Sequence, residues 1–468
     1  MSNGYISPLN NRYGSDDMKY IWSEQNKIMT WRHLWCVLAE TQKELGVDSI
    51  TDNQIKSMKD AVNKVDFSAI QNHESKTKHD VVANIHAFGD VAPEAKPIIH
   101  LGVTSQFVVD NAETIMVRDS LVRLIIKTAT VIDSLSDFAI DNADVPTVGL
   151  THLQPAQPTT VGKRATLWIQ DFVTVIEDLG FRLDRVRFRG AKGTTGTQAS
   201  FLNLFNNDAD KVKMMDEVIA SKLGFEKKNL VSIVGQTNPR IDDASLISSI
   251  CLIASAASKF ANDVRILSSK REMSEGFDRN NQVGSSAMAY KQNPITCEKI
   301  CSLSRYLISL VQNPYHTAAS QWMERTLDDS ANKRILLPEV FILADEILDS
   351  MTKVCNNMVI NHNMIEKHYQ EELPFFITEN VIIEAIKKNG VSRQDAHEEL
   401  RKLSVDVKNR VNSGKTNNLI YRISRKKMFK GINVKEMLDL KYTGLAEEQT
   451  IQYIQDIVTP IRRLYLGK

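Results

Sequence analysis

Hydrophobic residues recur along the chain at the three- and four-residue steps that are typical of amphipathic helices. Charged residues, among them Arg118 and Arg123, occupy the positions between the hydrophobic ones. This pattern predicts a long helix with one buried face. The buried face consists of Leu121, Leu124, Ile125, Thr128, Ile132, Leu135 and Phe138.

A second long segment, from Ala244 to Ala261, has apolar side chains on nearly all of its faces. A helix of this kind must be surrounded by protein, and its small Ala and Ser residues let neighbouring helices approach closely. We therefore expect it in the middle of a helix bundle. A membrane span is not expected, because the run is too short and too rich in serine.

The positions of the prolines also indicate long helices, because proline lacks the backbone N–H that a helix interior needs. No proline lies between Pro97 and Pro146, between Pro158 and Pro239, or between Pro239 and Pro294. Each gap has room for a helix of about 40 Å. Alternating runs are few, and no Asn-Gly or Asp-Gly turn joins two of them. The predicted fold class is therefore mainly α.

We expect three helical domains along the chain. The N-terminal helical domain covers residues 1–104, the central long-helix bundle covers 105–360, and the C-terminal helical domain covers 361–468. The central bundle contains a Gly-, Ser- and Asn-rich segment, residues 282–294, between two stretches of helical length. We call this segment the polar loop.

Composition excludes several classes of protein. The chain has 468 residues, 42% of them hydrophobic, with 58 Lys and Arg against 57 Asp and Glu. This balance argues against disorder and against a protein that coats nucleic acid. Among the five cysteines only Cys297 and Cys301 have a paired spacing, one helical turn, and no second pair accompanies them. The N-terminal residues lack the features of a secretion signal. We therefore expect a cytoplasmic protein without disulfides or a zinc site.

The segment 422–430 is locally basic, which admits two interpretations. One is a nucleic-acid patch, and the other is a solvated helix face or a crossing point between subunits. The second is favoured, because charge is balanced elsewhere in the chain and aromatic residues are sparse in the segment. We expect neither nucleic acid nor a membrane as a partner.

The polar loop is the densest group of polar residues that could carry chemistry. Loops between rigid helices often carry function. A simpler interpretation is a helix linker in which Ser285, Ser286 and Asn293 cap helix ends. That interpretation leaves Lys291, in the middle of the loop, without a purpose.

Residues Gly284–Pro294 resemble the GSSxMPxKxNP motif of the fumarase/aspartase superfamily. Further segments resemble one branch of that superfamily, the adenylosuccinate lyase family of the type found in animals. The resemblance extends from Arg12 to Gly444. The segments are Lys78-His79-Asp80, Leu101–Ser105 with Asp110-Asn111, Thr151–Gln157, Lys192–Gln198 and Glu324–Arg334.

The resemblance implies a carbon–nitrogen lyase of purine biosynthesis. Its reaction releases fumarate from adenylosuccinate, giving AMP, and from the succinylcarboxamide intermediate SAICAR, giving AICAR. The resemblance also implies a homotetramer in which the long helices form a shared core and each pocket uses segments of three subunits. It implies no cofactor. Metal-ligand spacings such as HExxH are absent from the sequence.

This elimination needs two opposed proton-transfer groups and a cradle for negative charge. By resemblance, Ser285 is the general base and His152 the general acid, and Glu298 orients His152. Lys291 and Asn293 stabilise the charge that develops on the succinyl carboxylate. For His152 alone a buried, hydrogen-bonded histidine is the simpler interpretation, but its THLQPAQ setting favours the acid.

The substrate-binding residues also come from the resemblance. His79 belongs to the proton network or the phosphate site, whereas His86 is assigned to packing. The glycines at 190, 193 and 196 fit neither GxxxxGK[ST] nor GxGxxG, so we expect an adaptable, donor-rich loop there. The phosphate side comprises Arg12, Tyr13, Lys78, Arg325, Ser330 and Arg334. The other substrate contacts are Asp80, Thr104, Ser105, Gln236, Thr237 and Lys299.

Three residues depart from the family pattern. Ala289 stands where proline is usual, so the polar loop loses a constraint on φ. Lys78 and Lys299 stand where animal-type sequences have arginine. An ammonium keeps the charge but lacks the planar two-pronged contact of a guanidinium, so we expect weaker or differently routed substrate contacts.

Two alternatives remain open at this point. The chain could be another superfamily member that acts on argininosuccinate, aspartate or malate. The segment Glu324–Arg334 disfavours this, since small diacids need no phosphate cradle. It could also be a structural protein without turnover, as lens crystallins are in this superfamily. The presence of Ser285, His152, Lys291 and Glu298 argues against that alternative.

Overall fold

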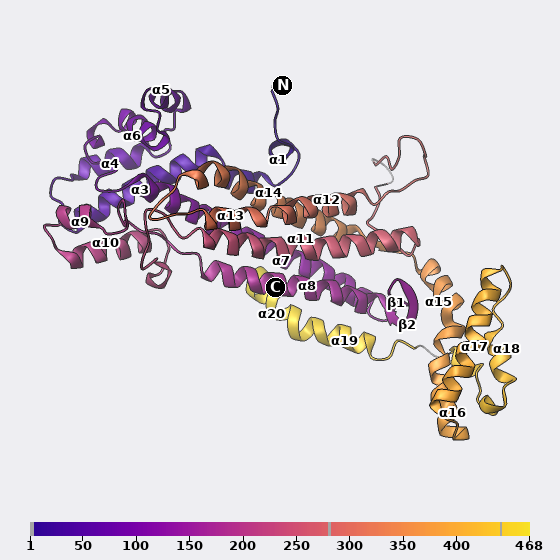
Figure 1. The fold of residues 1–468 in the computed structure, drawn as a ribbon. Coiled ribbons are helices and arrows are strands. Elements are labelled where there is room, and N and C mark those ends of the chain that lie inside the picture. Colours follow the sequence, from indigo (N-terminus) through magenta and orange to yellow (C-terminus); the bar gives the residue numbers. More distant parts are fainter. Residues whose placement is uncertain (1–3, 279–281, 440–441) are drawn as a thin grey trace. The chain divides into compact units, whose positions relative to one another are not determined.

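The computed structural model describes residues 4–278, 282–439 and 442–468, which are mostly helical (Figure 1). The prediction of a mainly α fold is confirmed. The long helices are α7 (Ser105–Asp141), α8 (Val161–Asp184), α11 (Ile241–Ser269), α12 (Ile295–Ser309) and α14 (Asp328–Asn357).

The described chain divides into two compact units, each drawn from three sequence segments. Unit 1 comprises residues 1–128, 174–258 and 299–351, and unit 2 comprises 129–173, 259–298 and 352–468. The three domains with boundaries at 104 and 360 stay a proposal.

Unit 1 holds the shorter helices of the N-terminal part and of the middle of the chain. Its elements outside the long helices are α1 (Pro8–Asn11), α2 (Asp16–Ile21), α3 (Glu24–Glu44), α4 (Asp52–Ala61), α5 (Phe67–Thr77), α6 (Asp80–Val91), η1 (Pro93–Ala95), α9 (Ala199–Leu204), α10 (Ala209–Lys222), η2 (Lys227–Asn229) and α13 (Gln312–Ala319).

Unit 2 holds short strands and the helices of the C-terminal part. Its elements outside the long helices are β1 (Pro146–Thr151), β2 (Gln154–Thr160), β3 (Met273–Ser274), β4 (Val359–Ile360), α15 (His362–Phe376), α16 (Thr378–Asn389), α17 (Arg393–Asn412), α18 (Leu419–Ser424), η3 (Lys427–Phe429), η4 (Glu436–Asp439), α19 (Ala446–Tyr453), the π-helical turn η5 (Ile454–Val458) and α20 (Thr459–Leu466).

The two helices that the hydrophobic pattern predicts are present. In α7, Leu121, Leu124 and Leu135 are completely buried, as the predicted stripe requires. Helix α11 contains the apolar segment 244–261, and Ile247 and Ile250 are completely buried. By length and composition α11 could cross a membrane, but 67% of its most apolar window is buried inside the structure. Its hydrophobicity is therefore accounted for by the protein core.

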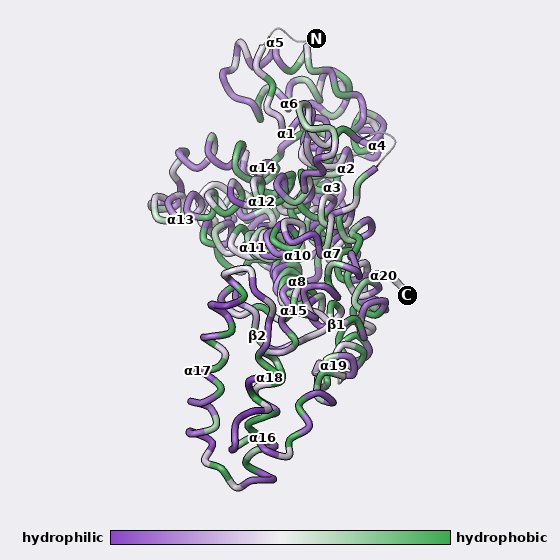
Figure 2. Tube along the Cα trace, turned by 90° about the vertical axis from the view of Figure 1, so that its right-hand side faces the viewer, coloured by the Kyte–Doolittle hydropathy of each residue, from purple (hydrophilic) through white to green (hydrophobic). Residues whose placement is uncertain are grey.

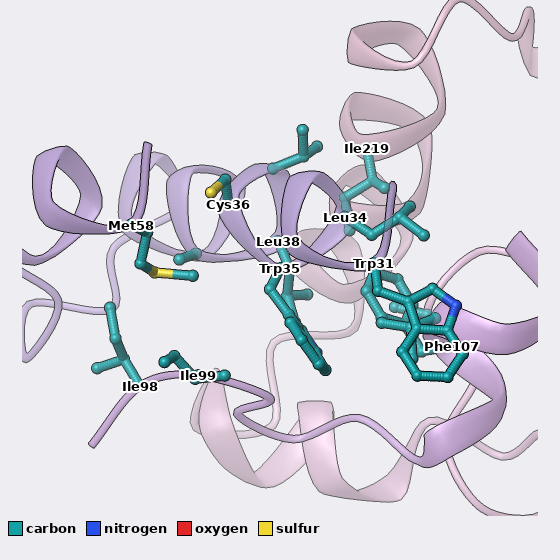
Figure 3. Close-up of a cluster of buried hydrophobic side chains, with 14 of the residues drawn as sticks. Trp31, Leu34, Trp35, Cys36, Leu38, Met58, Ile98, Ile99, Phe107 and Ile219 are labelled. Carbon is teal, nitrogen blue, oxygen red and sulfur yellow. The ribbon is translucent and has the colours of Figure 1, made fainter. Parts of the chain in front are cut away.

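The core of unit 1 is built around α3, whose side chains are shown in Figure 3. The ring of Trp35 stacks on Phe88 with centroids 6.0 Å apart. Its indole N–H donates a hydrogen bond to Nδ1 of His100 at 2.9 Å. His100 is thereby fixed as a neutral acceptor beside the core, because the same nitrogen cannot carry a proton.

In unit 2 a second core forms between α15, α16, α17 and α18. Along α17, Ala396, Leu400, Leu403 and Val407 are buried at the three- and four-residue steps of one helix face. Figure 2 shows the same pattern as green positions that interrupt a mostly purple helix.

The hairpin of β1 and β2 is an element that the hydrophobic pattern does not reveal. The strands are antiparallel, and the pair Thr151–Gln154 leaves His152 and Leu153 as a two-residue turn. Both turn residues have positive φ, 53° and 57°. Two-residue turns of this kind usually carry Asn or Gly, and here they carry His and Leu. Proline is unusual inside a strand, yet β2 contains two prolines. The sequence therefore shows neither the usual turn residues nor a typical strand.

We predict that His100 makes unit 1 less stable in acid. Burial, with the nearby His79, lowers the pKa of His100 to about 4. The unfolded chain takes up this proton near pH 6.5. The neutral His100 therefore contributes its full share to the free energy of unfolding above pH 6.5. This contribution is lost as the pH falls toward 4, and the total loss is at most about 3 kcal/mol.

The test compares urea unfolding of the wild type and His100→Asn at pH 7 and pH 4.5. Asparagine tolerates the positive φ of 69° and its oxygen replaces Nδ1 as the acceptor for Trp35. Between pH 7 and pH 4.5, His100→Asn should lose less free energy of unfolding than the wild type does. The exposed control His397→Asn should lose as much as the wild type. Equal acid sensitivity of all three proteins would contradict the prediction.

Candidate active site

The hydroxyl of Ser285 is held by the backbone of the polar loop. Its Oγ accepts hydrogen bonds from the N–H groups of Ala287, at 3.3 Å, and Met288, at 3.1 Å. Backbone donors aimed at an oxygen favour its negatively charged form. The arrangement can therefore stabilise an alkoxide, which a serine needs in order to act as a base.

The polar loop is folded back on itself around Gly284. A Cβ at this position would overlap the carbonyl oxygen of Lys291, so the close backbone approach requires glycine. The Asn293 side-chain amide donates to the carbonyl of Gly284 at 3.0 Å. Ser285, Lys291 and Asn293 are thus brought into one compact loop.

Glu275 fixes the start of the helix that follows the polar loop. Its two carboxylate oxygens accept the backbone N–H groups of Thr296, at 2.9 Å, and Cys297, at 2.7 Å. A carboxylate at a helix N-terminus also interacts favourably with the helix dipole. Glu298 lies in this first turn of α12, 4.0 Å from the guanidinium of Arg265. The sequence interpretation did not include Glu275.

His152 lies exposed in the β1–β2 turn, where its left-handed backbone is unusual for a residue other than glycine. Strained backbone of this kind clusters at functional sites. In the described part of this single chain, His152 forms no hydrogen bond with Ser285 or Glu298. The orientation of His152 by Glu298 therefore stays a prediction.

In unit 1, the connection between α5 and α6 carries Lys78, His79 and Asp80. Lys78 ends α5 with a φ of 53°, and His79 precedes the first residue of α6. Asp80 accepts the N–H of Val81 at 2.8 Å and lies 3.4 Å from Nδ1 of His79. Its second oxygen pairs with Arg334 at 2.6 Å. The fold thus brings the 78–80 segment and Arg334 together.

The segment around Gln236 meets the segment that contains Arg325. The backbone N–H of Gln236 donates to the carbonyl of Glu324 at 3.0 Å, and Thr237 Oγ1 accepts from Gln321 at 3.2 Å. Arg325 itself lies 3.6 Å from Asp329. These contacts place two predicted substrate-binding segments side by side although about 85 residues separate them.

Glu346 links Lys299 to the N-terminal segment. Its Oε1 lies 2.6 Å from Lys299 Nζ, and its Oε2 accepts the N–H of Gly14 at 2.8 Å. Burial raises the pKa of Glu346, but the hydrogen bonds from Lys299 and Gly14 outweigh burial and lower it. Lys299 is therefore near Arg12 and Tyr13, which directly precede Gly14.

The other predicted substrate residues lie at the starts of two long helices. Ser105 is the first residue of α7, preceded by Thr104, and Ser330 lies in the first turn of α14. All three are partly exposed.

A buried ion network lies beside these helix starts and was missed by the sequence interpretation. Arg240 pairs with Asp329 at 2.7 Å and with Asp110 at 3.1 Å. Lys333 pairs with Glu113 at 2.6 Å and also with Asp243. Burial raises the pKa of Asp110, but the charges of Arg240 and Lys333 outweigh it and the pKa is lowered.

This network connects the start of α7, the start of α11 and the start of α14 within unit 1. The sequence offered three partial signals, since Asp110, Asp329 and Lys333 all lie in the quoted family segments. Their partners are up to 220 positions away in the chain, as for Lys333 and Glu113. Spacing along the sequence therefore could not reveal the pairing.

The described residues contain no group of three or more His, Cys, Asp or Glu side chains that could hold a metal ion. All five cysteines are free and buried. Burial raises the pKa of Cys36 to about 12 and that of Cys251 to about 11, so neither thiol is a ready nucleophile.

Comparisons with known proteins give consistent results. The profile of the Lyase family matches residues 12–308. The chain is 43% identical to adenylosuccinate lyase of Schizosaccharomyces pombe, covering 97% of this chain and 95% of the relative. It is 42% identical to adenylosuccinate lyase of Saccharomyces cerevisiae, covering 96% and 94%.

Solved structures are similar in fold. A 3-carboxy-cis,cis-muconate lactonizing enzyme from Pseudomonas putida superposes with a TM-score of 0.81 at 20% identity, covering 97% of this chain and 99% of that chain. A fumarate lyase from Mesorhizobium gives a TM-score of 0.81 at 20% identity, covering 97% and 100%. At this identity the likeness concerns the fold alone.

We predict that Arg240→Met destabilises the protein strongly, because it leaves Asp110 and Asp329 buried without their shared counter-charge. The expected loss in free energy of unfolding is about 3–5 kcal/mol, measured by urea denaturation. The control is Arg123→Met, which removes an exposed pair with Asp17 and should cost less than about 1 kcal/mol. Similar effects of the two substitutions would show that the network is dispensable.

Proposed function

The chain belongs to the adenylosuccinate lyase family of the fumarase/aspartase superfamily, and from this premise we propose that it releases fumarate from adenylosuccinate, giving AMP. We propose the same elimination for SAICAR, giving AICAR, so that the enzyme acts twice in purine biosynthesis. The observation that carries the proposal is the Ser285 hydroxyl seated on two backbone amides inside a family-matching loop.

In the proposed mechanism Ser285 removes a proton from the carbon next to a succinyl carboxylate. Negative charge then develops on that carboxylate, where Lys291 and Asn293 stabilise it. The carbon–nitrogen bond breaks, the carbon–carbon double bond of fumarate forms, and His152 donates a proton to the departing nitrogen. One C–H bond and one C–N bond are exchanged for a C=C bond and an N–H bond.

We further propose that the active enzyme is a homotetramer whose pockets use more than one subunit. Support comes from the single chain, in which His152 lies exposed on a hairpin turn without a hydrogen bond to Glu298 among the described residues. In the tetramer, Glu298 of one subunit would accept a hydrogen bond from His152 of another and so orient the general acid. Exposed apolar side chains on the long helices, among them Val122, Ile126 and Leu252, are consistent with such an assembly.

The phosphate end of the substrate is assigned to unit 1. The assigned cations and hydroxyls, Arg12, Tyr13, Lys78, Arg325, Ser330 and Arg334, provide charge-assisted hydrogen bonds to a phosphate. We assign the remaining contacts to Asp80, Thr104, Ser105, Gln236, Thr237 and Lys299, and a proton-network role to His79. Arg334 pairs with Asp80 at 2.6 Å, so two of the assigned residues lie side by side.

We place the enzyme in the cytoplasm, with small molecules as its substrates and neither nucleic acid nor membrane as partners. The near-equal numbers of basic and acidic residues support the expectation that nucleic acid is not a partner.

The test of the function is fumarate release from adenylosuccinate, followed for the wild type and Ser285→Ala. Removal of the base should lower turnover by roughly 10²–10⁴-fold, with the helical circular-dichroism signal unchanged. Ser286→Ala is the matched control, because it removes the neighbouring hydroxyl and should retain turnover. The function is refuted if a well-folded wild type releases no fumarate, and the base assignment fails if the two alanine variants are equally active.

Shared pockets predict complementation between two inactive variants. When His152→Ala and Ser285→Ala proteins are mixed and allowed to exchange subunits, some hybrid pockets receive an intact acid and an intact base. Fumarate release should then rise well above that of either variant alone. Absence of recovery, despite exchange proven by native mass spectrometry of differently sized tagged subunits, would rule out pockets that combine these residues from different chains.

A further inference from the structure

We propose that Asp345, in the middle of α14, is a positioning residue that holds the N-terminal segment 12–15 in place, so that Arg12 and Tyr13 reach the phosphate of the substrate. The family motifs in the sequence do not include this carboxylate. The inference rests on the proposed function, because it concerns the phosphate end of the same pocket.

Two neighbouring carboxylates of α14 bind the backbone of the segment 12–15. Asp345 is completely buried, and its Oδ2 accepts the N–H of Ser15 at 2.7 Å. Glu346, the next residue of the helix, accepts the N–H of Gly14 at 2.8 Å. Hydrogen bonds to ionised carboxylates are stronger than those between neutral groups. Two successive N–H groups of the segment are therefore fixed against one helix.

The segment passes so close to α14 that residue 14 must be a glycine. Gly14 has a φ of 77°, and a Cβ at this position would lie 2.6 Å from Cγ2 of Ile342. Only glycine adopts such a backbone with so little space around it. The next residue, Ser15, is the N-cap of α2 and accepts the N–H of Met18 at 3.3 Å. The end of the segment is thus held on both sides.

These contacts hold the backbone and leave the side chains of Arg12 and Tyr13 available to a ligand. Arg12 is exposed and Tyr13 is half-buried, and neither side chain forms an ion pair within the described part of the chain. The same helix α14 carries Arg334 of the predicted phosphate side. Arg334 precedes Asp345 by 11 residues, about three helical turns, so both start from the same face of α14. One helix therefore supports two parts of the phosphate site.

Lys127 supplies the counter-charge that the buried carboxylate needs. Its Nζ lies 2.6 Å from Oδ1 of Asp345 and 2.7 Å from Oδ2 of Asp349. A buried charge that loses its partner carries a large desolvation penalty. Because Lys127 keeps Asp349 as a partner, Asp345→Ala does not leave this cation unpaired. The substitution therefore tests the hydrogen bond to Ser15.

The experiment is calorimetric titration of the full-length protein with AMP. Asp345→Ala should raise the dissociation constant at least about fivefold, because the released segment must then be ordered when the phosphate binds. Asp345→Asn keeps an oxygen that accepts the N–H of Ser15, and should bind AMP within about twofold of the wild type. Asp349→Asn is the matched control, since Asp349 pairs with the same lysine and should not affect AMP binding.

A second comparison separates positioning from a general structural role. In a protein that carries Arg12→Ala and Tyr13→Phe, the segment has already lost its contacts to the phosphate. If Asp345 acts through these side chains, Asp345→Ala should change the dissociation constant of AMP by less than about twofold in this background. A general structural role would weaken binding by the same factor in both backgrounds.

Thermal unfolding shows whether Asp345→Ala is folded. If it is not, Glu346→Ala releases the same segment at Gly14 and is measured in the same two backgrounds. The inference is overturned if release of the segment leaves the affinity for AMP unchanged, or weakens it equally in both backgrounds.

The inference also fails if the wild type does not bind AMP at millimolar concentration, even where it releases fumarate. Absence of fumarate release by a wild type that binds AMP would instead contradict the proposed function, and the titrations would still decide the role of Asp345.

Discussion

The guanidinium of Arg240, buried between Asp110 and Asp329, is the constraint on which the rest of unit 1 depends. Each of these three side chains is at most 5% exposed. An unpaired charge in such a position carries a large desolvation penalty, so the ions are tolerated only in this mutual geometry. Because Asp110 belongs to α7, Arg240 precedes α11 and Asp329 belongs to α14, one cation sets the positions of three long helices relative to each other at their N-terminal ends.

The predicted substrate-binding residues lie on these helix starts and on the segments joined to them. Arg325, Ser330 and Arg334 lie close to Asp329 in sequence, while Thr104 and Ser105 precede Asp110. The buried ion pairs of Arg240 hold the helix starts in place. The side chains of the predicted substrate-binding residues do not take part in these pairs with Arg240, so they are available to contact a ligand. Lys333, paired with Glu113 and Asp243, adds a second cross-link to the same region.

Unit 2 uses backbone geometry where unit 1 uses buried charge. The polar loop presents the Ser285 oxygen to two amides because Gly284 lets the chain pass close to the carbonyl of Lys291. The β1–β2 hairpin presents His152 at an exposed turn with a positive φ. Both loops place a side chain with a predicted catalytic role on a short, constrained stretch of backbone.

The sequence by itself determined the mainly α fold and the existence of α7 and α11, because helical periodicity is a local property that each segment carries. It also determined which residues belong to the family motifs, including Ser285 and Lys291. Tertiary structure alone decided the Arg240 network, the contact of Glu275 with α12 and the hairpin at His152. These features depend on charged residues that lie up to 220 positions apart in the chain, as Glu113 and Lys333 do. They also depend on positive φ angles at His152 and Leu153, where neither residue is a glycine or an asparagine. Pairing across such distances follows from the packing of whole helices, which no local pattern records.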